Sequence, residues 1–293
     1  MSAPRITILG ATGRLGQMMM SGLAERRDLE VIGQSRKPHT AYLHWNPEDG
    51  ADTLQSNLVG TAALLNLIGT TPTGAAREDD FAKVNRDLAI DVLGAARNAG
   101  VPRILMASSA AVYGRPTVAD QLFKETDTLA PLSAYGRSKA ALEQALGQQA
   151  GSDLTTLRIG NVAGADALLG QFTAQTKAID ITLDQFTDGS GPQRSYIGPK
   201  GLADVIGAIA LAPQQLPACL NIIAPPPIGM EDLLTSLDRA HPGSMQLNWR
   251  PAPENAIAKV GLCHERLAAE IGDVLRPVTS QTLVDEYLEH MSR

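Results

Sequence analysis

Short apolar runs alternate with helix-like segments through the first half of the chain. Five runs have the length and apolar character of buried strands: residues 6–9, 31–34, 63–68, 104–108 and 155–158. Segments with helical spacing of apolar residues occupy 15–26, 80–99 and 134–149. This alternation predicts an α/β fold, a doubly wound Rossmann-type parallel sheet with helices on both faces. Because ligands of such sheets bind at the carboxyl ends of the strands, we expect the functional residues there.

A glycine-rich turn follows the first run directly. Its sequence is GATGRLG, with glycines at positions 10, 13 and 16. Glycines allow a tight turn from strand to helix and let backbone amides approach a pyrophosphate, which the helix N-terminus stabilises. A turn needed only for packing is the alternative, and the position after the first strand favours a dinucleotide. The expected cofactor contacts in the turn are Gly10, Thr12, Gly13, Arg14, Leu15 and Gly16.

The end of the second strand distinguishes NAD from NADP. An acidic residue there binds a ribose hydroxyl, whereas a basic residue can pair with a 2′-phosphate. The chain reads Gly33-Gln34-Ser35-Arg36-Lys37 and has no carboxylate at this turn. Arg36, with Ser35 beside it, is expected to hold the phosphate by charge-assisted hydrogen bonds, which favours NADP. The alternative is that Arg36 and Lys37 are solvated loop charges.

Serine, tyrosine and lysine side chains follow the fourth predicted strand in a suggestive order. Ser108 and Ser109 end that strand, and Tyr135 and Lys139 lie on the next predicted helix. A spacing of four places the tyrosine and the lysine on one helical face, one turn apart. Lysine can then lower the phenol pKa, so that the tyrosine exchanges a proton with an alcohol or carbonyl during hydride transfer. A serine hydroxyl can orient the same oxygen.

Four motifs together resemble the extended short-chain dehydrogenase/reductases, the NAD-dependent epimerase/dehydratase family. They are the glycine turn at 10–16, SSAAVYG at 108–114, YGRSK at 135–139 and LRIGNVAG at 157–164. The resemblance continues through FAKVN at 81–85 and GPQRSYI at 191–197 and covers nearly the whole chain. It implies a Rossmann-fold enzyme that binds a nicotinamide dinucleotide.

The resemblance also assigns roles to single residues. Ser109 matches the catalytic hydroxyl, Tyr135 the acid/base and Lys139 its electrostatic partner, while Asn85 would support Lys139 through water. Asn161 matches a residue beside the substrate diphosphate, and Arg194 matches a phosphate-binding arginine. Strand ends complete the expected cofactor contacts with Leu67, Ile68, Gly69, Ser108 and Ile159. Ala110 and Ala111 stand where 4,6-dehydratases of the family carry an acidic pair, which argues against dehydration.

The second half of the chain has a less regular pattern. Proline clusters at 225–227 and 251–253 interrupt it, whereas 201–212 is helical and apolar enough to return to the sheet. We therefore expect a dinucleotide-binding domain at 1–164 together with 201–220. A smaller substrate-binding lobe is expected at 165–200 and 221–293. The tail from Ser280 has the apolar spacing of a packed amphipathic helix.

Composition limits the classes of partner. The net charge of −6, from 25 basic and 31 acidic residues, gives no support to a nucleic-acid or membrane surface. The start of the chain lacks a signal-peptide pattern, so we expect a cytoplasmic protein. Two distant cysteines, Cys219 and Cys263, predict neither a disulfide framework nor a thiolate site. The histidines show no metal-ligand spacing, and no metal is expected.

The sequence leaves the reaction open. The favoured hypothesis is reversible hydride transfer at a carbinol carbon of a sugar or nucleotide-sugar, by an epimerase or by a dehydrogenase. An NADPH-dependent carbonyl reductase is the alternative among enzymes, and a non-catalytic NAD(P)-binding sensor is the alternative outside them. A homodimer is expected to form through small apolar residues of one helix, namely Ala140, Ala141, Leu142, Ala145 and Leu146.

Overall fold

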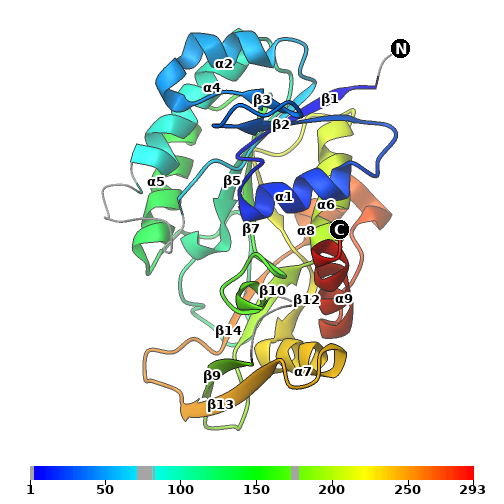
Figure 1. Ribbon diagram of the computed structural model, residues 1–293. Helices are drawn as coiled ribbons and strands as arrows, with labels where there is room; N and C mark the ends of the chain where they lie inside the picture. Colours follow the sequence, from blue (N-terminus) through cyan, green and yellow to red (C-terminus); the bar gives the residue numbers. More distant parts are fainter. Residues whose placement is uncertain (1–2, 71–80, 82, 173–177) are drawn as a thin grey trace.

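A seven-stranded parallel sheet forms the upper half of the protein in Figure 1. The computed structural model describes residues 3–70, 81, 83–172 and 178–293. Within these residues the strand order is β11-β7-β5-β4-β1-β2-β3, and each neighbouring pair is parallel. The strands are β1 (Arg5–Leu9), β2 (Glu30–Ser35), β3 (Tyr42–His44), β4 (Ala63–Asn66), β5 (Ile104–Ser109), β7 (Leu154–Ile159) and β11 (Cys219–Ile222). The predicted doubly wound α/β fold is confirmed.

Helices cover both faces of this sheet (Figure 1). On one side lie α1 (Arg14–Leu23) and α6 (Pro199–Leu211), and on the other α2 (Ala51–Leu58), α4 (Leu88–Asn98) and α5 (Ala134–Gly147). Neighbouring residues of a strand divide between the two layers: Leu65 packs with α1 and α6, and Leu64 packs with the other helices. Both are fully buried, and each such side chain contributes about 1.5–3 kcal/mol by leaving water.

Local hydrogen bonds explain where elements differ from the predicted ranges. The strand expected over 63–68 ends at Asn66, because the Asn66 side chain accepts a hydrogen bond from the backbone of Ile68 at 3.1 Å and turns the chain. Of the helix expected over 80–99, residues 80 and 82 lie outside the described part. From Lys83 onward the chain forms a π-helical turn, η2 (Lys83–Asp87), and continues as α4. Strand β3 and helix α2 were not predicted.

A second group of strands lies below the main sheet (Figure 1). Strands β12, β10, β14 and β6 form one sheet in that order, β8 joins β10, and β9 pairs with β13. Their bounds are β6 (Leu122–Phe123), β8 (Asn161–Val162), β9 (Ile179–Gln185), β10 (Gln193–Ile197), β12 (Ala224–Gly229), β13 (Met245–Pro251) and β14 (Lys259–Leu262). The helices here are α7 (Met230–Ala240), α8 (Glu265–Ile271) and α9 (Ser280–Met291).

The chain passes between the two sheets several times. Residues 199–222 form α6 and β11 of the upper sheet, although β10 before them and β12 after them belong to the lower one. The tail helix α9 buries Leu283, Val284 and Tyr287 in the core that α6 shares. The proposed division into two domains stays a prediction.

Two of the five residues of α5 expected in a dimer contact lie in the core, and the homodimer itself stays a prediction. Leu142 and Leu146 are each 2% exposed and pack with α4 and the sheet, so they are not a free surface. This corrects the prediction for these two residues. Ala140, Ala141 and Ala145 are only partly buried.

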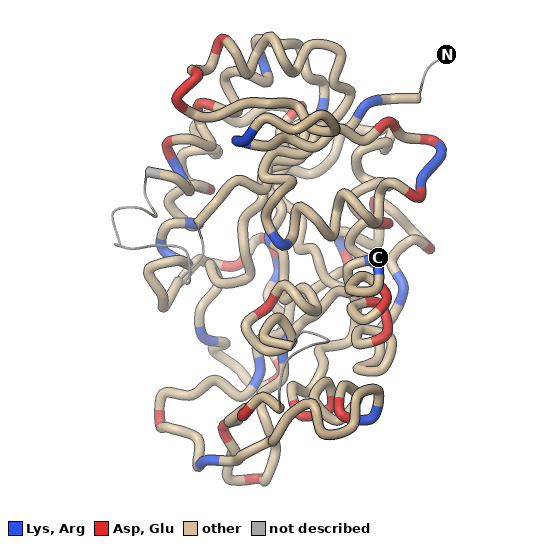
Figure 2. Tube along the Cα trace, viewed as in Figure 1, with Lys and Arg blue, Asp and Glu red and all other residues tan. Residues whose placement is uncertain are grey.

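Charges are mixed over the molecule. Figure 2 shows lysine and arginine interleaved with aspartate and glutamate in both halves of the chain trace. None of the described helices is long and apolar enough to cross a membrane. The described ranges also contain no cluster of three or more histidine, cysteine or acidic side chains suited to a metal ion.

Candidate active site and dinucleotide site

The glycine turn between β1 and α1 folds tightly against the end of β4. Gly10 has a positive φ of 78°, and a Cβ atom there would lie 3.1 Å from the backbone of Leu67 and Ile68. A Cβ atom on Gly16 would overlap the carbonyl oxygen of Gly10 and the backbone of Ala11. Glycine is therefore required at both positions for the turn to close.

The N-terminus of α1 fits a pyrophosphate. Gly13 is the N-cap, and no described side chain accepts a hydrogen bond from the first turn of the helix. Thr12, Gly13 and Arg14 are exposed, so the unpaired N–H groups face solvent with the positive end of the helix dipole. Leu15 is partly buried, and the guanidinium of Arg14 reaches the backbone of Gly170. The turn thus joins the upper sheet to the 169–171 segment.

Ser35 and Arg36, the residues at the end of β2 that are expected to distinguish NADP from NAD, lie in different environments. Ser35 is buried, and its hydroxyl accepts a hydrogen bond from the Lys37 amide at 3.2 Å. Arg36 is exposed, and its guanidinium forms no hydrogen bond or ion pair with any residue that the structure describes. Arg36 therefore presents an uncompensated positive charge where the chain leaves the sheet.

Gln34 is a contact that sequence reasoning missed. Its side-chain oxygen accepts a hydrogen bond from the Gly10 amide at 3.0 Å, and its amide donates to the carbonyl of Trp45 at 2.5 Å. Gln34 thereby fixes the glycine turn to the end of β3. The buried position of Gln34, 2% exposed, at the end of a parallel strand is the signal that could have indicated this role.

The structure brings Ser109, Tyr135 and Lys139 together. Helix α5 begins behind Ser133, whose hydroxyl accepts a hydrogen bond from Gly136, and this places Tyr135 and Lys139 on successive turns beside β5. The Ser109 side chain lies close enough to Tyr135 to act on the pKa of the phenol. The ammonium of Lys139 donates to the carbonyl of Ala107 at 2.9 Å and is 4% exposed.

Burial shifts the pKa of both titratable groups of this site, Tyr135 and Lys139. It raises the pKa of Tyr135, and the hydrogen bond with Ser109 opposes that change. It lowers the pKa of Lys139 to about 8, while the carboxylate of Glu143 acts in the opposite direction. The lowering of the Tyr135 pKa by Lys139 that the sequence predicted is not found, because burial is the largest effect on the phenol and acts in the opposite direction.

Asn85 lies behind Lys139. It is fully buried and bonded on both sides to the backbone of Thr70, and it donates to the Ser138 hydroxyl at 3.0 Å. Both side chains lie beside Gly69, since a Cβ atom there would be 3.0 Å from Asn85 Oδ1 and 3.4 Å from Lys139 Nζ. A water-mediated link between Asn85 and Lys139 stays a prediction.

The expected substrate residues lie on two paired strands. Asn161 on β8 is in register with Tyr196 on β10, and its side chain lies close enough to act on the pKa of that tyrosine. The hydroxyl of Tyr196 donates to the partly buried Asp166 at 3.0 Å, a contact that sequence reasoning did not anticipate. Ile159, at the end of β7, is in register with Ser109.

Arg194 on β10 is a half-buried cation. Its guanidinium donates to three backbone carbonyls, those of Gln193 at 2.7 Å, Ile257 at 3.0 Å and Ala258 at 3.2 Å. Burial lowers its pKa. Among the described residues no carboxylate forms an ion pair with it. The charge of Asp184 acts on Arg194 from a distance, and Asp184 itself pairs with Arg250 at 2.7 Å.

Ser108 has a partner inside the protein. Its hydroxyl is buried and donates to Glu143 at 2.5 Å instead of facing the sheet edge where a cofactor is expected. Glu143 was not singled out from the sequence, although its spacing of four from Lys139 continues the series that begins at Tyr135.

The fold, the glycine turn and the serine, tyrosine and lysine side chains define the class of Rossmann-fold proteins built for nicotinamide chemistry. The profile described as "NAD dependent epimerase/dehydratase family" matches residues 6–200. The chain belongs to this family.

The curated relatives described here are both named UDP-glucose 4-epimerase. A UDP-glucose 4-epimerase from Rhizobium leguminosarum bv. trifolii is 27% identical over 200 residues, which cover 63% of this chain and 61% of the relative. Another UDP-glucose 4-epimerase, from Azospirillum brasilense, is 27% identical over 56% of this chain and 51% of the relative. The chain therefore matches only half to three fifths of the length of these proteins.

Solved structures share the whole fold. MoeE5, solved with UDP-glucuronic acid and NAD, is 19% identical with a TM-score of 0.78 and covers 99% of both chains. A UDP-glucose-4-epimerase from Stenotrophomonas maltophila, solved with NAD and formylated UDP-arabinopyranose, is also 19% identical with a TM-score of 0.78, covering 99% of this chain and 98% of that one. At this identity the likeness concerns the fold alone.

Proposed function

We propose that the protein is a nicotinamide-dependent enzyme that oxidises and reduces a carbinol carbon of a nucleotide-sugar, with Tyr135 as the acid/base. The observation that carries this proposal is the grouping of Ser109 and Tyr135, both partly buried, with the buried Lys139. A protein that only binds a dinucleotide has no use for a phenol beside a desolvated lysine. The sensor hypothesis is therefore the weaker one.

Tyr135, Ser109 and Lys139 can each take a different part in proton transfer. The Tyr135 oxygen accepts the proton of the substrate hydroxyl, and the Ser109 hydroxyl donates a hydrogen bond to the same substrate oxygen. The Lys139 ammonium stabilises the phenolate that alternates with the phenol. When bound, the nicotinamide cofactor supplies the acceptor and donor of the hydride.

An anionic substrate is supported by Arg194. A half-buried guanidinium without a carboxylate partner in the described part of the chain is suited to a diphosphate. The names of the relatives point to UDP-sugars, and Asn161 on the adjoining strand would lie beside the same group. We infer a sugar nucleotide as the substrate class and epimerisation as the favoured reaction.

The cofactor preference is a separate proposal. The family description and the solved neighbours concern NAD, whereas the β2 end of this chain carries an exposed Arg36 and no carboxylate. We infer that the protein accepts NADP and prefers it to NAD. Because Arg36 favours NADP, an NADPH-dependent carbonyl reductase is the second candidate function.

One experiment separates these candidates. Purified protein is incubated with a panel of UDP-sugars, with and without added NAD or NADP, while absorbance at 340 nm and sugar composition are followed. Epimerisation predicts interconversion of two sugars without net absorbance change. Steady consumption of NADPH supports the reductase, and Tyr135→Phe must abolish whichever activity is found. No turnover in any arm would favour the sensor.

A further inference from the structure

Residues 164–172, which follow β8, lie between the glycine turn and the tail helix. A Cβ atom on Gly170, in the short 3-10 turn η4 (Leu169–Gln171), would overlap the guanidinium of Arg14 and lie 2.9 Å from the carbonyl oxygen of Gly164. Because Gly170 has no side chain, the segment packs directly on the first residue of α1. It thereby limits where the Arg14 side chain can lie, in the turn that is expected to bind the dinucleotide.

Tyr287 of α9 holds the other side of the same segment. Its hydroxyl donates to the carbonyl of Phe172 at 2.8 Å, and a Cβ atom on Gly164 would overlap its ring. The side chain is almost completely buried, with 5% exposed. Arg14, residues 164–172 and Tyr287 are therefore packed against one another in that order.

The tail helix is itself attached to two helices of the upper sheet, α1 and α6 (Figure 1). The Ser21 hydroxyl on α1 and Nδ1 of His290 share a hydrogen bond of 3.0 Å. One turn earlier in α9, the Glu286 carboxylate accepts a hydrogen bond of 3.0 Å from the Gly201 amide near the start of α6. Tyr287 therefore extends from a helix that is fixed to the dinucleotide-binding half of the molecule.

The segment is also tied to a strand that carries an expected substrate residue. The Asp166 side chain accepts hydrogen bonds from the Tyr196 hydroxyl on β10 at 3.0 Å and from the Leu169 amide at 3.1 Å. Tyr196 lies two residues after Arg194 on the same strand. Residues 164–172 thus connect the expected dinucleotide contacts to the expected substrate contacts.

We propose that Tyr287 is a positioning residue of the dinucleotide site, which holds residues 164–172 against Arg14 and so couples dinucleotide binding to substrate binding. This inference rests on the proposed function, because it takes the glycine turn as the dinucleotide site and β8 and β10 as the substrate site. Tyr287 lies behind the segment and acts through it. An arginine side chain that is held in place before its ligand arrives loses less conformational freedom on binding.

The test removes the Tyr287 hydroxyl and keeps the ring against Gly164. Dissociation constants of NADP and NAD are measured by calorimetry for the full chain and for Y287F. We expect both constants to rise roughly two- to tenfold in Y287F, because the ligand must then order a segment that lacks one buried hydrogen bond.

The coupling between the two ligands is the second readout. It is the ratio of the UDP dissociation constants measured without and with saturating dinucleotide. This ratio should exceed one in the unaltered protein and fall towards one in Y287F. With both ligands saturating, kcat should be retained, because Ser109, Tyr135 and Lys139 lie on other elements.

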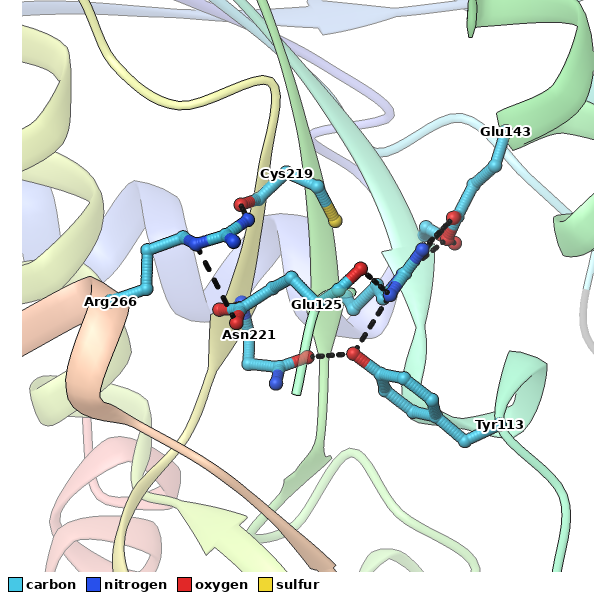
Figure 3. Close-up of polar contacts among 8 residues, drawn as sticks. Tyr113, Glu125, Glu143, Cys219, Asn221 and Arg266 are labelled. Atoms are coloured by element: carbon cyan, nitrogen blue, oxygen red, sulfur yellow. Dashed lines mark hydrogen bonds and ion pairs between the residues drawn. The ribbon is translucent and has the colours of Figure 1, made fainter. Parts of the chain in front are cut away.

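The matched control is Y113F. The Tyr113 hydroxyl is also buried, and it donates to Asn221 at 2.6 Å, outside residues 164–172 (Figure 3). Both variants lose one buried hydroxyl and should unfold at lower temperature. Only Y287F should alter the dissociation constants and the coupling.

Unchanged dissociation constants or unchanged coupling in folded Y287F, or equal increases in Y113F, would overturn the proposal. Should Y287F fail to fold, Gly170→Ala disturbs the same packing from the side of Arg14, and an unchanged NADP affinity there contradicts the proposal equally. Weaker dinucleotide binding in Y287F, in a protein that turns over no UDP-sugar, would refute the proposed function and leave the role of Tyr287 standing. If the unaltered protein bound neither dinucleotide, both proposals would be wrong.

Discussion

Arg36 is the residue on which we expect cofactor choice to depend. Its charge is exposed and has no partner in the described part of the chain, so a 2′-phosphate would gain a charge-assisted contact worth about 1.5–3 kcal/mol. We predict that the protein binds NADP roughly ten- to a hundredfold more tightly than NAD. Arg36→Asp should invert this order, because a carboxylate repels the phosphate and accepts hydrogen bonds from a ribose.

Calorimetric dissociation constants for both cofactors check this prediction. Lys37→Asp is the matched control, since it reverses the neighbouring charge and should alter the ratio much less. Equal affinities for NAD and NADP in the unaltered protein would show that Arg36 is only a solvated charge.

Lys139 gives the reaction a predicted pH dependence. Its pKa is lowered by burial to about 8, so it carries its proton below that pH and loses it above. Because the ammonium form stabilises the Tyr135 phenolate, kcat should fall as pH rises through about 8. Lys139→Arg keeps the charge to higher pH, and in that variant the falling limb should disappear from the range up to pH 10. A limb that stays in place would assign it to another group.

At the scale of elements, the turn between β1 and α1 requires Gly16, because the backbone around it leaves no space for a side chain. In Gly16→Ala the new methyl group would overlap the Gly10 carbonyl, so we predict a loss of about 1–3 kcal/mol in the free energy of unfolding together with weaker dinucleotide binding. Gly94→Ala in α4 is the matched control, because a Cβ atom there meets nothing within 4 Å.

The control should gain about 0.5–1 kcal/mol, the usual advantage of alanine over glycine within a helix. Urea unfolding followed by circular dichroism measures both changes. If the two variants were equally stable, the close packing assigned to Gly16 would be wrong.

Elements with a strong apolar period could be predicted from the sequence, and short ones could not. Helix α5 begins at Ala134 as expected because Ser133 caps it, and the motif on it fixes Tyr135 and Lys139. Strand β3 has only three residues and joins the sheet through pairing with β2, which no local pattern specifies. The partners of Gln34 and Glu143 lie on segments far away in the sequence, so these contacts become visible only when the sheet is assembled.

At the scale of the whole molecule, the proposed site takes residues from both sheets. The glycine turn, Ser109 and α5 belong to the upper sheet, whereas Arg194 lies on β10 of the lower one. The buried contacts around Asn221 tie these halves together (Figure 3). A substrate that bridges the two sheets should therefore stabilise the molecule as one unit.

Binding of a sugar nucleotide should accordingly raise the unfolding temperature, and Arg194 should be required. A ligand at a hundredfold excess over its dissociation constant adds about 2.7 kcal/mol to the free energy of unfolding. We predict that UDP-sugars shift the unfolding temperature of the cofactor-saturated protein and that Arg194→Ala removes most of this shift. Arg115→Ala is the matched control, because Arg115 also donates to backbone carbonyls of the same loop, those of Asn255 and Ala256. If both variants lost the shift equally, Arg194 would act by anchoring the loop; if neither did, the diphosphate would bind elsewhere.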